Sequence, residues 1–200
     1  MPALTELFDH MSRFVPVSAE DKQVLTDLVE VRSVRKKEHL LSPGEICHAN
    51  YFVKKGCLRM YFIKDNGLEH TLQFALENWW ITDFMSLENR KPTNMYLQAV
   101  EPAEVVVLTK TNMDILSGQV PQMERYLRLI AERAFAASLF RMQYFFELSV
   151  ESRYEQFNRR FPEFVQRIPQ YMLAGFLGFT PEVLSKIRSK KRAGARKKLG

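Results

Sequence analysis

The chain has few of the residues that mark exported or metal-binding proteins. Its 200 residues include two cysteines, Cys47 and Cys57, and four scattered histidines. Two cysteines are too few for a disulfide framework, and their spacing is not that of zinc or iron–sulfur ligands. We therefore expect reduced thiols, no metal site and a cytoplasmic protein.

Long hydrophobic runs are also lacking. The longest uncharged segment, residues 168–181, is shorter than the roughly 20 residues that cross a bilayer, and it contains Gly175 and Gly178. The first 15 residues carry Glu6 and Asp9 and have no continuous apolar segment, so they do not resemble a secretory signal. Because 46% of the residues are hydrophobic, the chain can still bury a core. The sequence thus predicts a folded protein without a membrane partner.

The basic residues gather at one end of the chain. From Lys186 onward there are eight Lys or Arg residues and no acidic residue, which leaves 21 basic against 23 acidic residues in the rest. A nearly neutral body with a cationic end indicates that this end contacts a polyanion.

Residues 31–109 have the pattern of a β domain. Short stretches rich in β-branched and aromatic residues, NYFVKK, CLRMYFI, HTLQFA, MYLQAV and EVVVLT, are separated by turn residues at 42–44, 55–56 and 65–67. Two short helices are expected within residues 3–30, the second capped by Ser18. This pattern predicts an α+β fold whose N-terminal β domain is a sandwich or a small jelly roll.

A long helix should follow the β domain. Residues 122–161 contain neither glycine nor proline, and Pro121 suits the first turn. One apolar line, interrupted by Arg141, is assigned to a homodimer interface: Met123, Leu127, Ile130, Ala134, Ala137 and Tyr144. A second line runs through Phe135, Leu139, Met142 and Phe146. A helix with two apolar faces needs two partners, which we take to be its own β domain and a second copy. A helix buried within a monomer is the alternative.

The stretch YMLAGFLGFTPEVLSKIR, residues 171–188, predicts two helices that meet at a tight turn. Gly178 lies where the first helix should end in a left-handed conformation, and Thr180 and Pro181 suit the cap and first turn of the second helix. The expected buried positions are Leu173, Ala174, Leu177, Phe179, Leu184 and Ile187. This spacing is typical of a helix-turn-helix unit, with an ordinary helical hairpin and a solvated basic end as the alternative.

The outward positions of the second helix have the chemistry of DNA readout. A carboxylate accepts from cytosine, lysine reaches guanine, and a methyl group contacts thymine. The predicted DNA-binding residues are Gln170, Thr180, Pro181, Glu182, Val183, Ser185, Lys186, Arg188, Ser189, Lys190, Lys191 and Arg192. Within this set, Arg188, Lys191 and Arg192 are expected to contact phosphates, which position the helix without reading sequence.

These parts together resemble the Crp/Fnr family of bacterial transcription regulators, which combine a cyclic-nucleotide-binding-like sensor domain with a helix-turn-helix. The resemblance extends from about residue 4 to Arg192 and is most specific in IPQYMLAGFLGFTPEVLSKIR; SPGE, YFVKKGCLRMYF and TDFMSLENRKPTNMYLQAVE carry it in the sensor. It implies a homodimer on double-stranded DNA that reads a palindromic operator, with RNA polymerase as a further candidate partner. The expected domains are a sensor (1–118), a dimerisation helix (119–148) and a helix-turn-helix with a basic tail (149–200).

The resemblance also assigns roles on the second helix. In the family, a glutamate followed four residues later by a basic residue makes key base contacts, and Glu182 and Lys186 match this pair. Lysine replaces the commoner arginine, and Pro181 stands where a further arginine often occurs, so the operator sequence does not transfer. The family normally continues into a β-hairpin wing, whereas SKKRAGARKKLG is short and basic and is expected to form a flexible tail on phosphates rather than a folded wing.

The sensor departs further from the family pattern. Members that bind cyclic AMP hold its phosphate with a glycine–glutamate pair and, several residues on, an arginine beside a serine. The corresponding candidate effector segment here is Thr82, Asp83, Thr93 and Asn94, without the arginine. Arg90 and Lys91 lie close by as substitutes, unless they belong to a solvated loop. We therefore expect no cofactor and an unknown small-molecule effector other than cyclic AMP, or none.

The predicted function is a DNA-binding transcription regulator of the Crp/Fnr type that acts as a homodimer and is not an enzyme. The alternative is a ligand-binding or interaction module of the same fold that has lost specific DNA recognition. A jelly-roll enzyme would need clustered histidines and a glutamate around a metal, whereas His70 with Glu69 is isolated.

Overall fold

The computed structural model describes the backbone of residues 4–197 and the side chains of residues 4–190. The chain forms two compact units. The first contains the residues up to Tyr61 together with Gln73–Ala136, and the second contains Phe62–Leu72 together with the residues from Ala137 onward. This grouping differs from the predicted boundaries at residues 118 and 148, because a hairpin segment of the β domain belongs with the C-terminal helices.

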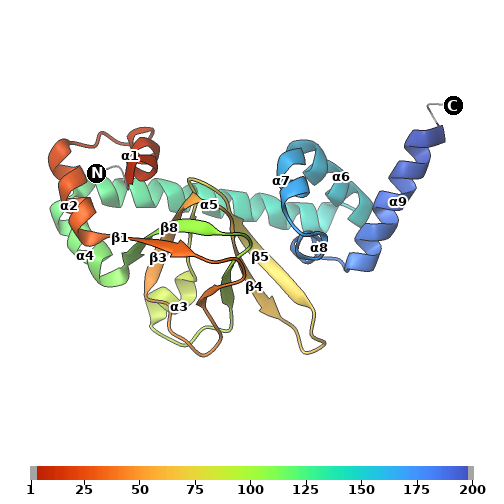
Figure 1. The fold of residues 1–200 in the computed structure, drawn as a ribbon, viewed down its shortest axis with the longest axis horizontal. Coiled ribbons are helices and arrows are strands. Elements are labelled where there is room, and N and C mark those ends of the chain that lie inside the picture. The colour runs from red at the N-terminus through yellow and green to blue at the C-terminus, as the bar shows by residue number, and fades with distance from the viewer. Residues whose placement is uncertain (1–3, 198–200) are drawn as a thin grey trace. The chain divides into compact units, whose positions relative to one another are not determined.

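The first unit contains the predicted jelly roll (Figure 1). One sheet has the strand order β1 (Glu30–Val34), β8 (Ala103–Thr109), β3 (Ala49–Lys55) and β6 (Trp80–Ile81). The other has the order β2 (His39–Leu41), β7 (Tyr96–Ala99), β4 (Leu58–Ile63) and β5 (Glu69–Ala75). A cluster of buried side chains draws on both sheets, including Val53 and Val105 from the first and Leu58 and Leu97 from the second. The α+β class and the jelly roll are thereby confirmed.

Helices close one side of the first sheet. These are α1 (Thr5–Ser12), α2 (Ala19–Leu28), α4 (Lys110–Gln119) and the beginning of α5 (Pro121–Glu147), while α3 (Phe84–Asn89) follows β6. Leu7, Leu25, Leu116 and Met123 form a second buried cluster with Phe52 of β3. Ser18 caps α2 as predicted, because its hydroxyl accepts from the backbone N–H of Asp21 (3.0 Å).

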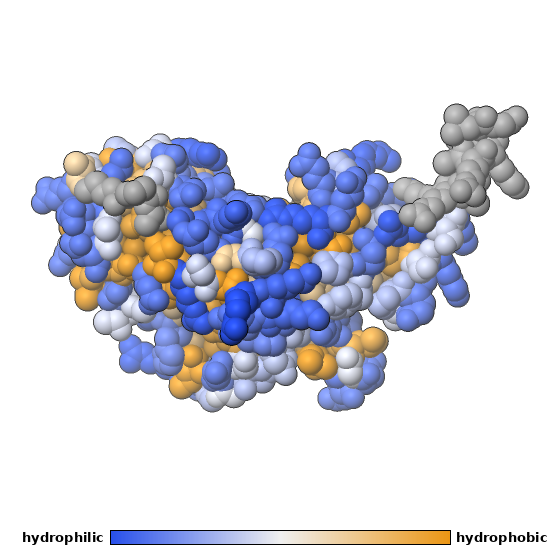
Figure 2. All heavy atoms as spheres, in the orientation of Figure 1, coloured by the Kyte–Doolittle hydropathy of each residue, from blue (hydrophilic) through white to orange (hydrophobic). Residues whose placement is uncertain are grey.

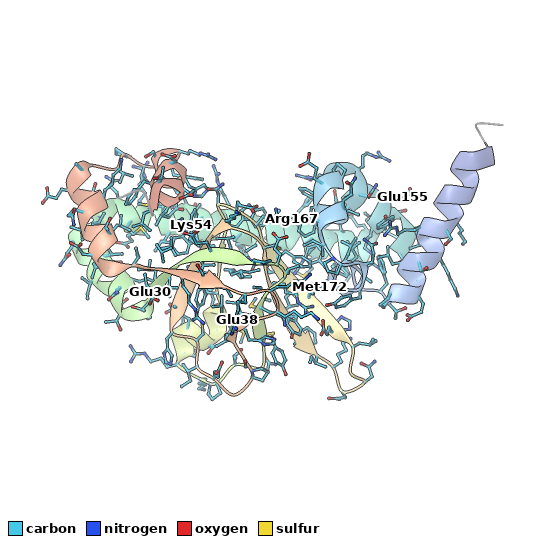
Figure 3. All side chains as sticks on the ribbon, viewed as in Figure 1. Glu30, Glu38, Lys54, Glu155, Arg167 and Met172 are labelled. Carbon is cyan, nitrogen blue, oxygen red and sulfur yellow. The ribbon has the colours of Figure 1, made fainter. Side chains whose placement is uncertain are left out.

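An amine is buried between α1 and the sheet (Figure 3). The side chain of Lys54 on β3 is 6% exposed and forms an ion pair with Glu104 of β8. Its Nζ also lies 3.9 Å from the carboxylate of Glu6 on α1. A buried ammonium is tolerated only when it is paired; Glu104 supplies this pairing within the sheet, and Glu6 connects α1 to the same amine.

A buried hydrogen-bond chain connects three parts of the first unit. Tyr126 of α5 is fully buried, and its hydroxyl lies 2.9 Å from Nε1 of Trp80 and 2.7 Å from Nδ1 of His10. An indole N–H can only donate, so the Tyr126 hydroxyl accepts from Trp80, while the direction of its hydrogen bond with His10 is set by the tautomer of the imidazole ring. Burial, together with the charges of Arg13 and Arg133, lowers the pKa of His10. The neutral ring of His10 is therefore part of the folded structure.

The second unit is built mainly of helices. Besides residues 62–72 of the β4–β5 hairpin and the later part of α5, it contains α6 (Val150–Arg160), α7 (Pro162–Arg167), α8 (Gln170–Leu177) and α9 (Pro181–Lys197). Between α5 and α6, Ser149 caps α6 by accepting from the backbone N–H of Ser152. The expectation of a flexible tail from Ser189 is wrong for the backbone up to Lys197, because α9 continues to that residue. Over the described part of the chain, no helix combines the length and the apolar content that crossing a membrane would require.

The state of His10 should make the stability of the protein depend on pH. Because the folded-state pKa lies below the unfolded value near 6.5, the unfolded chain takes up the proton first. The stabilisation is then complete above about pH 6.5 and is lost as the pH falls towards the folded-state pKa. We expect the urea concentration at the unfolding midpoint to decrease as the pH is lowered from about 7.5 to about 5.5. In His10→Gln, which keeps an acceptor for Tyr126 without titrating, this decrease should be smaller; equal decreases in both proteins would contradict the role of His10.

Candidate nucleic-acid interface and sensor cavity

The turn between α8 and α9 requires glycine for two reasons. Gly178 ends α8 with a φ of 81°, the left-handed conformation that was predicted. The backbone N–H of Phe179 donates to the carbonyl oxygen of Ala174 over 3.1 Å, which closes the end of the helix. A Cβ atom at position 178 would lie only 2.3 Å from Cε1 of Phe145. The sequence therefore encodes both the turn and its close approach to α5.

The predicted buried side of the helix-turn-helix is observed. Leu173, Ala174, Leu177, Leu184 and Ile187 are buried, while Phe179 is half-buried rather than buried. With these side chains packed inward, α9 presents its other face to solvent. The exposed residues of this face are Pro181, Glu182, Ser185, Lys186, Ser189 and Lys190.

The remaining predicted DNA-binding residues differ in exposure. Gln170, Thr180, Val183 and Arg188 are half-buried. The side chains of Lys191 and Arg192 lie outside the described residues. All of the described members of the set lie at the start of α8 or along the turn and α9, so the helix-turn-helix places them on two neighbouring elements.

The leading end of α9 carries an oriented carboxylate. Hydrogen bonds from the Thr180 hydroxyl and from the residue's own backbone N–H lower the pKa of Glu182. An ionised, solvent-exposed acceptor at a helix N-terminus is also favoured by the helix dipole. Glu182 is therefore an ionised, solvent-exposed hydrogen-bond acceptor at the start of α9.

Two arginines fix the helix-turn-helix within the second unit. Arg141 of α5 donates to the backbone carbonyl of Leu72, and its guanidinium lies 5.0 Å from the ring centre of Phe176 on α8. Burial removes water from the guanidinium of Arg141 and thereby lowers its pKa. The contacts with Leu72 and Phe176 replace part of that lost hydration. Arg153 of α6 donates to the carbonyl of Leu177 over 3.0 Å, at the end of α8. The interruption of the apolar line at Arg141 is thus explained by a structural contact.

The β4–β5 hairpin approaches α8 very closely. A Cβ atom at Gly175 would lie 2.5 Å from the carbonyl oxygen of Glu69, so only glycine fits at this point. The hairpin also carries hydrophobic residues on its surface, where Ile63 and Leu68 are exposed (Figure 2). Residues 62–72 are therefore packed as part of the helical unit, which the sequence pattern did not indicate.

The predicted dimer-interface line requires a correction. Met123 is 1% exposed within the core of its own chain, and Leu127 and Ile130 pack partly against the same core. Tyr144 is half-buried, whereas Ala134 and Ala137 are exposed. The most solvent-exposed apolar side chains of α5 belong to the second line, Phe135, Leu139, Met142 and Phe146, and are 47–84% exposed. The exposed apolar face of α5 is therefore formed by the second line.

The buried polar side chains of the candidate effector segment form hydrogen bonds within the protein. Asp83 is buried, caps α3 by accepting from the backbone N–H groups of Met85 and Ser86, and accepts from the Thr93 hydroxyl over 2.5 Å. The Thr82 hydroxyl donates to the carbonyl of Ala49 over 2.9 Å. Asn94 is exposed, as are the proposed substitutes Arg90 and Lys91. A buried carboxylate in this segment disfavours an anionic phosphate there.

A cavity of about 310 Å³ lies elsewhere in the first unit. Its lining comes from β3, β5, β6, α3, α4 and α5 and includes Asn50, Gln73 and Trp80. Thr82 is one of the four predicted effector residues, and it lies in the lining of this cavity. Asn50, Gln73 and Trp80 were not predicted as site residues, because their neighbourhood depends on contacts that are distant in sequence.

Comparison with known proteins supports the observed arrangement. Residues 31–118 match the family model of the cyclic nucleotide-binding domain. The chain is 29% identical over 121 residues to the transcriptional activator protein FnrA of Stutzerimonas stutzeri and 26% identical over 118 residues to the transcriptional activator protein Anr of Pseudomonas protegens. Each match covers 58% of this chain and 48% of the relative, so the chain spans about half the length of these relatives.

Solved structures show the same fold. FixK2 from Bradyrhizobium japonicum has a TM-score of 0.71 at 17% identity, over 84% of this chain and 86% of that chain. The c-di-GMP responsive global regulator CLP from Xanthomonas campestris has a TM-score of 0.71 at 13% identity, over 89% of this chain and 93% of that chain. The structure joins a cyclic-nucleotide-binding-like domain to a helix-turn-helix. The chain is thus similar to regulators of the Crp/Fnr type, and residues 31–118 match the cyclic nucleotide-binding domain family.

Substitution of Gly178 should destabilise the protein. Gly178→Ala places a side chain in the left-handed region, at a cost of about 1–2 kcal/mol, and adds a clash with Phe145. The matched control is Gly118→Ala, because Gly118 lies within α4 and a Cβ atom there would have no other atom within 4 Å. The control substitution should raise the free energy of unfolding by about 0.5–1 kcal/mol, because alanine favours a helix more than glycine does. Chemical denaturation measures both, and similar free energies of unfolding for the two variants would refute the strain at Gly178.

Proposed function

We propose that this protein is a sequence-specific transcription regulator that binds double-stranded DNA as a homodimer. The observation that carries this proposal is the exposed face of α9, which presents Glu182 and Lys186 one turn apart at the start of the helix. A helix of this kind enters the major groove with its N-terminal residues towards the base edges. The proposed domains are a sensor, a dimerisation helix and a helix-turn-helix.

The chemistry of α9 separates base readout from phosphate contact. The Glu182 carboxylate suits a cytosine amino group, the Lys186 amine suits guanine, and the Val183 methyl groups suit thymine. Thr180, Pro181, Ser185, Ser189 and Lys190 complete the proposed groove-facing set. Gln170 and Arg188, together with Lys191 and Arg192, are assigned to phosphates, which account for most of the salt-dependent affinity.

A homodimer follows from the exposed apolar line of α5. Phe135, Leu139, Met142 and Phe146 form a stripe on one helix, which a second copy of the same helix would bury. A two-fold axis between such helices gives two recognition helices and hence a palindromic operator with half-sites about 34 Å apart. We further propose a cytoplasmic, non-enzymatic protein that acts together with RNA polymerase and responds to a small molecule.

Enrichment of a randomised DNA duplex pool by the purified protein at physiological salt tests the proposed function. A palindromic consensus is expected. Weak, salt-sensitive binding without a consensus, both alone and with cell extract, would instead identify an interaction module of the same fold that lacks operator recognition.

Lys186→Ala should lower the affinity for the enriched operator roughly tenfold and relax the preference at one base pair per half-site, because a good base contact contributes about 1–3 kcal/mol. Competition binding with operator variants measures this effect. Lys55→Ala is the matched control, since Lys55 is exposed at the end of β3 and far from α9 in sequence. If the two variants weakened binding equally, Lys186 would not be a base-reading residue.

Leu139→Asp should produce monomers, because an aspartate in the exposed apolar line would be buried without a partner. Light scattering measures the oligomeric state, and operator affinity should decrease with it. Ala136→Asp carries the same charge on the exposed surface of α5 but lies outside both apolar lines, so it should remain a dimer. A dimeric Leu139→Asp protein would remove the second line from the interface.

A further inference from the structure

The cavity in the first unit has mainly apolar walls. Among its lining residues are Trp80, Ile81, Phe84, Met113, Leu127 and Ile130. They come from β6, α3, α4 and α5, so the cavity lies where the jelly roll meets two helices. Its volume of about 310 Å³ falls at the lower end of the roughly 300–1,000 Å³ that ligand cavities occupy. The walls therefore suit a small molecule with a largely apolar body.

One polar side chain in the lining lacks a partner. Asn50 of β3 is 3% exposed, and within the described residues nothing donates a hydrogen bond to its Oδ1 atom. A buried acceptor without a donor destabilises the folded protein, because it has lost its hydrogen bonds to water. Thr82 and Gln73, which also line the cavity, direct their donors to the backbone carbonyls of Ala49 and Trp80. A ligand with a hydrogen-bond donor inside the cavity would supply the missing partner of the Asn50 Oδ1 atom.

Both cations of the lining are already paired, and the carboxylate of Glu124, which also lies in the lining, is exposed to solvent. Lys110 lies 3.0 Å from Asp114 and 3.6 Å from Glu88, and the hydrogen bond to Asp114 raises the pKa of Lys110. Arg128 forms an ion pair with Glu132 over 2.5 Å. An anionic ligand would have to compete with these carboxylates and would also meet the charge of Glu124, so the electrostatics disfavour an anion.

We propose that this cavity binds a small uncharged molecule with an apolar body and one hydroxyl or amide N–H donor, which bonds to Asn50. This inference rests on the proposed function, for which it names the class of effector. The same cavity contacts Leu127 and Ile130 on the first half of α5. Occupancy would therefore strengthen the packing of the jelly roll against that helix. A second copy of the chain does not meet the same need, because the exposed line of α5 offers only Phe, Leu and Met side chains, which have no hydrogen-bond donor.

Matched probe pairs test the donor directly. 4-Ethylphenol and cyclohexylmethanol each have a hydroxyl, and their methyl ethers keep the apolar body without the donor. Calorimetric titration of the full chain should give roughly three- to tenfold tighter binding of each hydroxyl compound than of its ether, since one such hydrogen bond contributes about 0.5–1.5 kcal/mol. 4-Ethylbenzoate, which adds a negative charge, should bind more weakly than 4-ethylphenol.

Two variants locate the binding. In Asn50→Leu the preference for the hydroxyl compounds should disappear, whereas in Ala134→Phe, which narrows the cavity, both members of each pair should bind at least tenfold more weakly. Wild-type protein that binds neither pair at millimolar concentration, binds each ether as tightly as its alcohol, or prefers the benzoate would overturn the proposal. Because the probe pairs are compared on wild-type protein, this test does not depend on the folding of the variants.

Further outcomes separate the cavity from the proposed function. Binding of the probes only to the monomeric Leu139→Asp protein would show that a second copy occupies the cavity, and would also overturn the proposal. Loss of probe binding alongside an intact operator consensus would reject the ligand class but leave the DNA-binding function standing. Probe discrimination without any operator consensus would support the cavity and reject the regulator.

Discussion

The hydroxyl of Tyr126 is the interaction on which the first unit depends. One buried oxygen accepts from Trp80 on β6 and shares a hydrogen bond with His10 on α1, while its own ring belongs to α5. These two hydrogen bonds meet at one atom, so the strand, the N-terminal helix and the long helix are held in one arrangement. Trp80 is also a wall of the cavity, which gives that wall a fixed position.

Much of the fold is predictable from local chemistry. The strands were indicated by β-branched and aromatic stretches between turn residues, and the helix-turn-helix by Gly178, Thr180 and Pro181, each of which has a specific conformational reason to be there. The helical continuation of α9 was missed because its basic composition was taken as a sign of flexibility, although lysine, arginine and alanine favour helices and one glycine costs only about 1 kcal/mol.

Other features depend on contacts that periodicity does not reveal. The two apolar lines of α5 have the same character in the sequence, and only the packing of Met123 shows which one faces the core. The structural roles of Arg141 and of residues 62–72 likewise depend on neighbours about 70 to 110 positions away in the chain. The cavity is a third case, since its unpartnered Asn50 is an ordinary strand residue until the helices close over it.

The segment that was predicted to hold an effector is stabilised by its own hydrogen bonds. Asp83 accepts from the Thr93 hydroxyl and from backbone N–H groups at the start of α3. The segment thereby stabilises the jelly roll. The fold therefore does not carry the chemistry of the signal, which depends on the residues at individual sites.

The contact between the hairpin and α8 has an evolutionary consequence. Gly175 meets the backbone carbonyl of residue 69, and not its side chain. Selection on this fit therefore acts on one partner only: position 175 cannot drift from glycine without moving the hairpin, whereas position 69 is free to vary as far as this contact is concerned. The two positions would show no correlated substitutions among descendants of this gene, even though they touch.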